Sequence, residues 1–333
     1  MKLASWIYWK MDDVKRAAKR RGMVETVRKT GIDIALCVWS VEEIVENAEA
    51  IGKLTEELAD GGAELHVGIS PFSHVGRVAK RRLYQYDVAG KRSCGGLCPS
   101  WPENRERVLR DVRRISRSAR FPGLHLDFIR YLFSAGTPWQ LEWEAGREWI
   151  DTFHWCECDA CRTARAKWLS RPDLTAYDRL HPGVVFKEVE FRKRNIDDLM
   201  RRIRHTTDEH GLMLSIAQRV QYLNRAVLEG QDWMEWAEEG LFDFTCPMNY
   251  STCTGTFRER LAANMPRLAG RGEVEVYEGI SRRSSAGESS IATVLEQMSA
   301  ALELGADGVT LFHMGVLQPG EHDEIRRWKR SVS

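Results

Sequence analysis

The 333-residue sequence lacks several features that would place it in a common class at once. No apolar run approaches the roughly 18 residues that a membrane-spanning helix needs, so we expect no membrane partner. The 49 basic and 48 acidic side chains leave a formal net charge of +1, which gives no electrostatic reason to expect a nucleic-acid partner. The amino-terminal stretch has no clean apolar run before a small-residue cleavage site, and we therefore expect a cytoplasmic protein without a signal peptide.

Motifs of nucleotide sites and catalytic-metal sites are missing as well. Neither G-x-G-x-x-G nor G-x-x-x-x-G-K occurs, which disfavours an open nucleotide-binding sheet. No His-x-His occurs, although a metal-dependent barrel hydrolase of the amidohydrolase type usually carries one at the end of its first strand. The C-x3-C-x2-C triplet of a radical-SAM iron–sulfur cluster is also absent.

The sequence does contain a regular alternation of short apolar runs and longer helical patterns. The runs predicted to be strands are 3–9, 32–39, 63–70, 123–131, 212–218, 242–248, 273–279 and 307–314. Helices are predicted between them, and the one that opens at Ser40 carries a capping box with Glu43 and ends at Gly61-Gly62. Eight strand–helix units over 1–333 predict a single α/β domain, a (β/α)8 TIM barrel with long loops after strands 3 and 4.

Eight cysteines are present and several of them are clustered. A C-x-C-x-x-C motif lies in 132–183, which we predict to be a loop insertion that carries a zinc knuckle. In a reducing compartment such a cluster more often binds a metal than forms disulfides, and a fourth thiolate would complete a tetrahedral structural zinc site. The candidate ligands are Cys98, Cys156, Cys158 and Cys161. Cys94 and His154 are alternatives to Cys98 as the fourth ligand.

Acidic residues near the carboxyl ends of the predicted strands are candidates for catalysis, because the chemistry of a TIM barrel takes place there. Alternation puts His125 and Asp127 on the face that points into the barrel, and a carboxylate there calls for a partner such as Arg130. Glu278 closes the predicted seventh strand. The alternatives are a buried ion pair for Asp127 and a solvent-facing loop position for Glu278.

Paired carboxyl groups at one site are the arrangement that glycoside hydrolysis uses, one as acid/base and the other as nucleophile or as base toward water. Twelve tryptophans fit that substrate class, because sugar rings stack their C–H faces on aromatic rings. The tryptophans at or after predicted strand ends are Trp39, Trp101, Trp139 and Trp143. A near-neutral net charge fits an uncharged sugar.

Four stretches of the sequence resemble a known family. GLHLDFIRY, QDWMEWAEEGLFDFTCPMNYS, ADGVTLFHMGVL and GLCPSWPENRERVLRDV are similar, in the right order, to the glycosyl-hydrolase-like 10 group of bacterial barrels. The resemblance covers roughly residues 95–315 apart from the long insertion. It implies a glycosidase-type barrel with Asp127 at the site, and it places Met248, Asn249 and Tyr250 at the rim.

The cysteine pattern resembles a second family. Family 42 β-galactosidases carry a C-x-C-x-x-C loop and an earlier cysteine that together hold a structural zinc, and the four candidate ligands match that pattern by position. The clan of that family ends its fourth strand in Asn-Glu, whereas this chain has Leu126-Asp127 at the equivalent point. The acid/base residue of that clan is therefore not carried over.

The prediction from sequence is a glycoside hydrolase that cleaves an oligosaccharide or glycan with Asp127 and Glu278, with a structural Zn²⁺ and no organic cofactor. The residues expected to contact the carbohydrate are Trp39, His66, His125, Arg130, Asn249, Tyr250 and His313. Two alternatives stay open: a non-catalytic carbohydrate-binding barrel, and a metal-dependent hydrolase of the amidohydrolase type.

Overall fold

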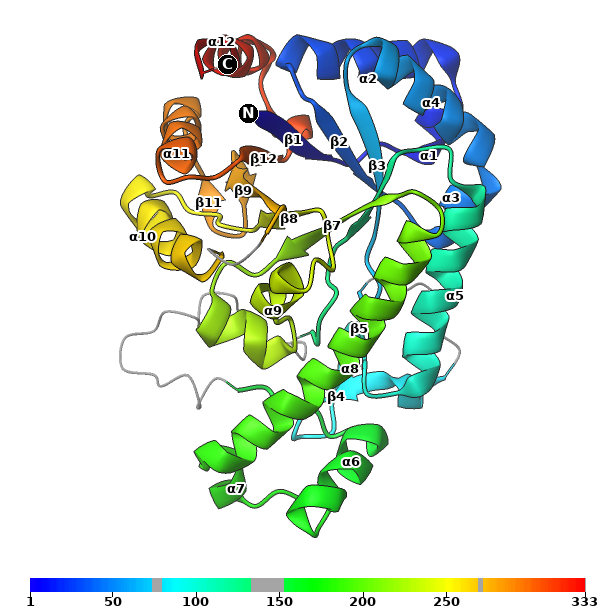
Figure 1. Cartoon of the computed structure of the whole chain (residues 1–333), viewed down its shortest axis with the longest axis vertical. Helices are drawn as coiled ribbons and strands as arrows, with labels where there is room; N and C mark the ends of the chain where they lie inside the picture. The colour runs from blue at the N-terminus through cyan, green and yellow to red at the C-terminus, as the bar shows by residue number, and fades with distance from the viewer. Residues whose placement is uncertain (74–79, 133–152, 269–271, 333) are drawn as a thin grey trace.

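Eight parallel strands close into a barrel in the computed structural model (Figure 1), which describes residues 1–73, 80–132, 153–268 and 272–332. Around the barrel the strands follow the order β1-β12-β9-β8-β7-β6-β3-β2, which is also their order along the chain once the ring is closed. Their bounds are β1 Lys2–Ile7, β2 Ile34–Val38, β3 Glu64–Ile69, β6 Gly123–Leu126, β7 Met213–Gln218, β8 Phe244–Pro247, β9 Glu275–Ser281 and β12 Gly308–Phe312. The predicted (β/α)8 barrel is confirmed.

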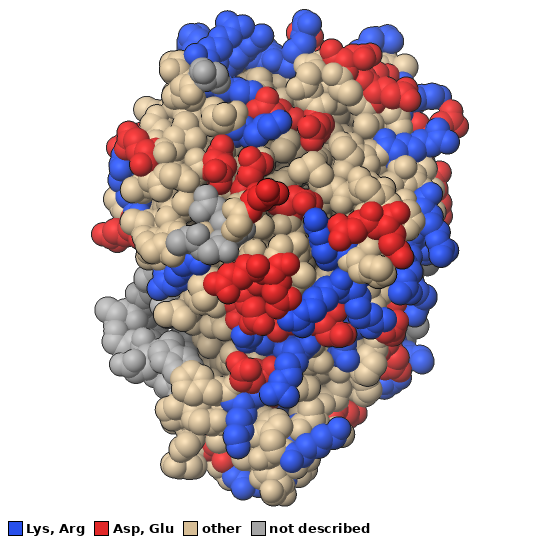
Figure 2. Space-filling model, viewed as in Figure 1, with Lys and Arg blue, Asp and Glu red and all other residues tan. Residues whose placement is uncertain are grey.

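Helices surround this barrel and follow its strands. They are α1 Met11–Val14, α2 Ala17–Thr30, α3 Val41–Glu46, α4 Ala48–Asp60, α5 Pro102–Ser118, α6 Asp159–Leu169, α7 Ala176–Leu180, α8 Pro182–Asp208, α9 Trp233–Glu238, α10 Thr254–Asn264, α11 Ile291–Glu303 and α12 Pro319–Val332. Within the described chain, none of these helices combines the length and the apolar character needed to cross a bilayer. On the face shown in Figure 2, basic and acidic side chains are interspersed.

Several predicted elements end at different residues in the structure. The capping box of Ser40 and Glu43 is present, but the helix that it opens breaks at Asn47 into α3 and α4. The helix predicted between the strands at 212–218 and 242–248 is confined to the short α9. Gly230 takes a left-handed backbone conformation (φ 75°), which ends the helical turn before it. Asp232 then caps α9 by accepting a hydrogen bond from the backbone N–H of Glu235.

The loops after β3 and β6 are long, as expected, and they contain elements that the sequence did not reveal. The loop after β3 forms a hairpin of β4 Tyr84–Tyr86 and β5 Arg92–Leu97. The described part of the segment after β6 contains α6 and α7, which lie at the end of the molecule farthest from α12 in Figure 1. The backbone N–H of Glu157 donates to the carbonyl oxygen of Tyr86, so the two loops are in direct contact.

Side chains of each strand alternate between the inside of the barrel and the layer under the helices. The inner group is small and partly aromatic: Ala4, Trp6, Ile34, Leu36, Ala217, Phe244, Cys246 and Tyr277. The outer layer is larger and contains the intervening residues of the same strands, such as Leu3, Val67, Leu124 and Val276. This alternation decides which polar side chains can reach the interior of the barrel.

Gly123 illustrates how tightly the interior is packed. It pairs with His66 of the neighbouring strand, and a Cβ at Gly123 would collide with the imidazole of that residue, which is fully buried. We expect Gly123→Ala to lower the free energy of unfolding by about 1–3 kcal/mol because of overpacking. Denaturant unfolding followed by circular dichroism measures this change.

Gly22→Ala is the matched control, because an added Cβ at this position of α2 would meet no atom within 4 Å. In a helix this change is expected to stabilise by roughly 0.5–1 kcal/mol. An unfolding midpoint in Gly123→Ala equal to that of the native chain would contradict the described packing.

Candidate functional site

The carboxyl ends of β1, β8 and β12 bring aromatic side chains together at one opening of the barrel, here called the mouth. The ring of Tyr250 lies 4.8 Å from that of Phe312, which in turn lies 5.8 Å from that of Trp6. Tyr8 lies 6.2 Å from Phe312 and 5.1 Å from His313, and its side chain is about half exposed (51%). The mouth therefore offers aromatic surface next to solvent.

Asp127 lies at this mouth, directly after β6. Its backbone N–H donates to the carbonyl oxygen of Ile69, and its Oδ1 accepts a hydrogen bond of 2.8 Å from the backbone N–H of Phe128. Burial raises the pKa of both Tyr8 and Tyr250, and the negative charge of Asp127 adds to each shift, so the carboxylate lies close to both phenols. These two tyrosines consequently stay protonated hydrogen-bond donors at neutral pH.

The turn after Asp127 has an unusual backbone. Phe128 takes a left-handed conformation with φ of 54°, which is costly for a bulky side chain and persists where surrounding contacts enforce it. The guanidinium of Arg130 lies 4.5 Å above the ring of Phe128. The turn thus brings the guanidinium of Arg130 into contact with Phe128, the residue that follows the candidate catalytic residue Asp127.

Arg130 does not take Asp127 as its ion-pair partner, which corrects the expectation from sequence. Its Nε lies 2.9 Å from Oε2 of Glu229, and Arg219 contacts the same carboxylate through Nε (3.1 Å) and Nη2 (3.3 Å). All three side chains are buried. Glu229 could not be identified from the sequence pattern, because it lies in a single helical turn far along the chain from β6. Arg219, in contrast, directly follows β7.

Two of the three histidines predicted to contact substrate, His66 and His125, are enclosed inside the barrel. His125 accepts a hydrogen bond from Nε1 of Trp6 (3.1 Å) at Nε2, and its Nδ1 lies 2.9 Å from Oγ of Ser215. Burial, with a smaller electrostatic contribution from His66, lowers the pKa of His125 to about 3, so the ring is neutral. His66 is fully buried beside Glu64, at the amino end of β3 and away from the mouth.

Glu278 does not lie at the end of its strand as expected. β9 continues to Ser281, two residues beyond the predicted end, and Glu278 stands at its centre. Tyr277 belongs to the inner group, whereas Val276 and Ile280 belong to the outer layer, so alternation places Glu278 under the helices. This position separates Glu278 from the mouth residues and does not favour its use as the second catalytic carboxyl group.

The surroundings of Glu278 are apolar and enclosed. Burial raises the pKa of its carboxyl group to about 8, against the opposing effect of the neighbouring Asn249 amide. Oε1 of Glu278 and Oδ1 of Asn249 have no hydrogen-bond partner among the described residues, and Nδ2 of Asn249 donates to the carbonyl oxygen of Phe257 on α10. A protonated carboxyl group can donate a hydrogen bond there, which a carboxylate cannot do.

Two of the four tryptophans proposed to stack on sugars lie in the described part of the chain. Trp39 is buried and its Nε1 donates to the carbonyl oxygen of Trp9, so it packs beside β2. Trp101 precedes α5 and lies under the guanidinium of Arg82. Trp139 and Trp143 fall outside the described residues. The aromatic surface at the mouth comes mainly from Tyr8, Tyr250 and Phe312, of which the sequence analysis singled out one, Tyr250.

Four buried cysteines form a second site between the loops after β3 and β6. The Sγ atoms of Cys98, Cys156, Cys158 and Cys161 lie within 4.8 Å of one another. Sγ of Cys98 is 3.6 Å from that of Cys161 and 3.8 Å from that of Cys156. Thiolates about 2.3 Å from a tetrahedral zinc are about 3.8 Å apart, so the cluster has the right size to bind such an ion.

The two alternatives for the fourth position do not join this cluster. Among the described side chains, the cluster contains Cys98 and not His154. Burial and the charges of Arg225 and Arg192 lower the pKa of His154 to about 4. The side chain of Cys94 lies outside the described part of the structure. Burial raises the pKa of the Cys98 thiol, and a bound dication would offset this by stabilising the thiolate.

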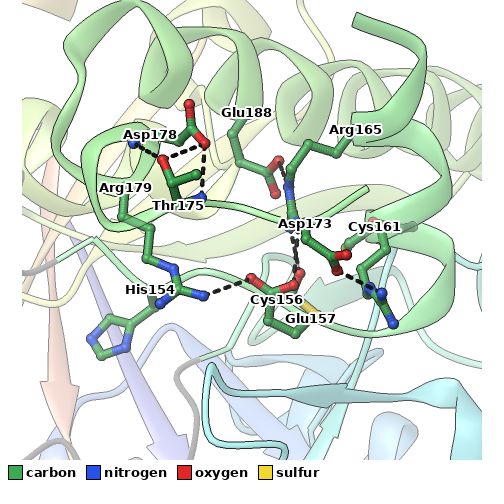
Figure 3. A network of polar contacts seen from close by, with 12 residues as sticks. His154, Cys156, Glu157, Cys161, Arg165, Asp173, Thr175, Asp178, Arg179 and Glu188 are labelled. Atoms are coloured by element: carbon green, nitrogen blue, oxygen red, sulfur yellow. Dashed lines mark hydrogen bonds and ion pairs between the residues drawn. The ribbon is translucent and has the colours of Figure 1, made fainter. Parts of the chain in front are cut away.

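A buried ionic network connects the cysteine loop to α8 (Figure 3). Arg165 contacts Glu188 on α8 (3.4 Å) and Glu157 in the loop (3.1 Å), and its Nη2 donates to the carbonyl oxygen of Cys156. Arg192 contacts Glu188 from the next turn of α8 and donates to the carbonyl oxygen of His154. The loop that carries three cysteines is thereby held against the longest helix.

The cysteine cluster is also connected to the mouth. Oγ of Ser100 lies 3.0 Å from Sγ of Cys161 and 2.9 Å from the hydroxyl of Tyr131. The backbone N–H of Tyr131 donates to the carbonyl oxygen of Glu229, the residue whose carboxylate holds Arg130. A short chain of contacts therefore joins the cysteine cluster to the charged residues near Asp127.

Glu278 generates a prediction about the pH dependence of stability. Its folded pKa of about 8 lies above the ordinary value of 4.5, so the folded chain holds a proton that the unfolded chain releases between these pH values. The contribution of protonated Glu278 to the free energy of unfolding is fully present below about pH 4.5 and is lost as the pH rises through 8. The free energy of unfolding falls by roughly a few kcal/mol over this range. We expect Glu278→Gln to remove this loss and to be more stable than the native chain at pH 9.

Unfolding by denaturant at several pH values measures the difference. Glu259→Gln on the exposed side of α10 is the control and should follow the native chain. A pH profile of Glu278→Gln that parallels the native one would show that Glu278 is not a protonated buried acid.

Comparison with known proteins supports the fold assignment. No family model matches this sequence, and no curated protein matches it either. Among solved structures, the glycoside hydrolase domain of PgaB (BpsB) from Bordetella bronchiseptica is similar with a TM-score of 0.68 and 13% identity, covering 97% of each chain. A β-galactosidase from the psychrophilic Marinomonas ef1 has a TM-score of 0.72 and 13% identity over the whole of this chain, which spans 59% of that enzyme.

The spore cortex-lytic enzyme SleL of Bacillus megaterium is a third similar structure, with a TM-score of 0.54 and 8% identity over 98% of this chain and 73% of that one. Identities this low establish the fold and not the activity. Carbohydrate-active barrels are prominent among the chains that share the architecture of this protein.

Proposed function

We propose that this chain is a glycoside hydrolase that cleaves a glycosidic bond in an oligosaccharide or glycan at the mouth of its barrel. The observation that carries the proposal is the placement of Asp127 at the carboxyl end of β6, partly exposed and beside two protonated phenols. The likeness to a β-galactosidase and to a glycoside hydrolase domain supports it at the level of the fold.

Asp127 is proposed to stabilise or attack the positively charged sugar carbon that develops as the bond breaks. The half-exposed ring of Tyr8 and the ring of Phe312 offer apolar faces for the C–H side of a sugar. The hydroxyl groups of Tyr8 and Tyr250 donate hydrogen bonds to sugar oxygens, since their raised pKa keeps them protonated.

The predicted partner carboxyl group, that of Glu278, lies on the outer face of its strand, under the helices. Glu278 stays a prediction that one variant tests directly: retained turnover in Glu278→Gln would remove it from the mechanism. The carboxylate of Glu229 is already paired with two guanidinium groups.

We also propose that the cysteine cluster binds one Zn²⁺ as a structural ion. Four protein thiolates would fill a tetrahedral coordination sphere and leave no position for substrate. The ion would join the loop after β3, which carries Cys98, to the segment that carries the other three cysteines. The ion would then contribute to the reaction by positioning these two loops, while the described residues at the mouth perform the chemistry.

Asp127→Asn tests the proposed activity. Release of reducing ends from a panel of plant and bacterial polysaccharides identifies a substrate of the native chain. On that substrate we expect Asp127→Asn to lower kcat/KM by about 10²–10⁴-fold, because the carboxylate charge is lost while the shape is kept. Asp12→Asn, at an exposed position in α1, is the control and should retain the native rate.

Full activity of Asp127→Asn would contradict the proposed role. Binding of a polysaccharide by the native chain without turnover would instead favour the non-catalytic carbohydrate-binding alternative.

Metal analysis by mass spectrometry tests the zinc proposal. We expect one zinc ion per native chain, and loss of that zinc together with a lower unfolding temperature in Cys156→Ser. Cys253→Ser is the matched control, because Cys253 is exposed and lies outside the cluster. Native chain without metal, or Cys156→Ser with full zinc content, would refute the proposal.

A further inference from the structure

Ser100 connects the two loops that carry the cysteine cluster. It lies two residues after Cys98 in the loop after β3, and its Oγ is 3.0 Å from Sγ of Cys161, which belongs to α6. The turn that contains Ser100 is closed by hydrogen bonds from the backbone N–H of Trp101 and from Nδ2 of Asn104 to the carbonyl oxygen of Cys98. This turn therefore holds a buried hydroxyl against a sulfur from the other loop.

A series of hydrogen bonds runs from α8 towards this sulfur, and its first member fixes their direction. The side-chain amide of Asn195 lies with Nδ2 3.0 Å from the carbonyl oxygen of Phe191, and only a donor can make that contact. The same Nδ2 lies 3.0 Å from the hydroxyl oxygen of Tyr131. The amide therefore donates to Tyr131, whose own proton is left for another acceptor.

The next two members have one arrangement in which every hydroxyl proton meets an acceptor. The hydroxyl of Tyr131 lies 2.9 Å from Oγ of Ser100 and donates to it. Among the described residues, the acceptor left for the proton of Ser100 is then Sγ of Cys161. If Cys161 were the donor instead, the proton of Ser100 would lack an acceptor in a buried place, which costs free energy.

This direction suits a sulfur that bears negative charge. A thiol is a weak hydrogen-bond acceptor, whereas a thiolate is charged and accepts a stronger bond. Four thiolates around one dication leave net negative charge, and all four cysteines of the cluster are buried. A hydrogen bond to one of the sulfurs stabilises that charge and so favours the metal-bound cluster over free thiols.

We infer that Ser100 donates a hydrogen bond to the thiolate of Cys161 in the metal-bound chain and thereby determines how tightly the cluster retains its ion, with Tyr131 orienting the Ser100 hydroxyl. The inference rests on the proposed zinc site and assigns to it two positioning residues that are not ligands. Both act on the ion through Sγ of Cys161. Hydrogen-bond partners of this kind change metal affinity by about 10–100-fold.

Competition for Zn²⁺ between the loaded chain and a chromophoric chelator of known affinity, in the presence of a phosphine reductant, measures this effect. We expect Ser100→Ala to bind Zn²⁺ about 10–100-fold more weakly than the native chain. Tyr131→Phe should lose less affinity, because the Ser100 hydroxyl is still present but is no longer oriented. Ser116→Ala is the matched control and should keep the native affinity, because this serine of α5 is also buried and its Oγ has no hydrogen-bond partner among the described residues.

Two further measurements distinguish a hydrogen bond to sulfur from a loss of packing. In the Co²⁺-loaded chain, the sulfur-to-cobalt charge-transfer absorption should move to longer wavelength in Ser100→Ala, because a sulfur without its hydrogen bond gives up an electron more readily. The band should stay at its native position in Ser116→Ala. The double variant Ser100→Ala/Tyr131→Phe should lose no more affinity than Ser100→Ala alone, because Tyr131 acts through Ser100.

Native Zn²⁺ affinity in Ser100→Ala would overturn the inference and leave the zinc site intact. An unshifted charge-transfer band, or losses that add in the double variant, would overturn it too. If Ser100→Ala fails to fold, Tyr131→Phe decides, and native affinity with a native band in that variant contradicts the inference. A native chain that binds neither Zn²⁺ nor Co²⁺ would instead remove the proposed zinc site, and the inference with it.

Discussion

The alternation of side chains along parallel strands is the constraint on which the rest of this structure depends. In a closed barrel one set of residues is enclosed by the strands and the other by the helices, and a shift of one position exchanges the two sets. This separates His125, which is neutral and hydrogen-bonded inside the barrel, from Glu278, which shares the outer face of β9 with Val276 and Ile280. Both residues are buried, whereas the partly exposed Asp127 and Tyr250 lie just beyond the ends of their strands.

Residues beyond the strand ends need support that the barrel itself does not give. Two sets of contacts support the segment after β6. One is the cysteine cluster with the ion pair of Arg165 and Glu188, and the other is the carboxylate of Glu229. Tyr131 connects them, because its hydroxyl contacts Ser100 beside Cys161 and its backbone contacts Glu229. An ion bound by the cysteines would therefore also hold the contacts that lead to Glu229 and Arg130.

Much of the fold could be predicted from the sequence, since hydrophobic period and capping are local signals. The eight strands and the cysteine motif are of this kind, because their members are close together in the chain or follow a regular order. Glu278 shows where local signals fail: β9 runs two residues past its predicted end, and strand ends are set by pairing with neighbours such as β12. Arg219 and Glu229 could not be joined to Arg130 from sequence, because their contacts depend on how separate loops fold over the mouth.

The same reasoning limits what net charge reveals about a substrate. A formal charge of +1 over the whole chain fits a neutral sugar, yet it averages many solvated pairs, such as those interspersed in Figure 2. Exposed pairs of this kind are screened and contribute little to recognition. A single desolvated guanidinium with two terminal nitrogens unpaired acts far more strongly on a ligand that touches it. The overall balance of charge therefore carries little information about the ligand of a buried site.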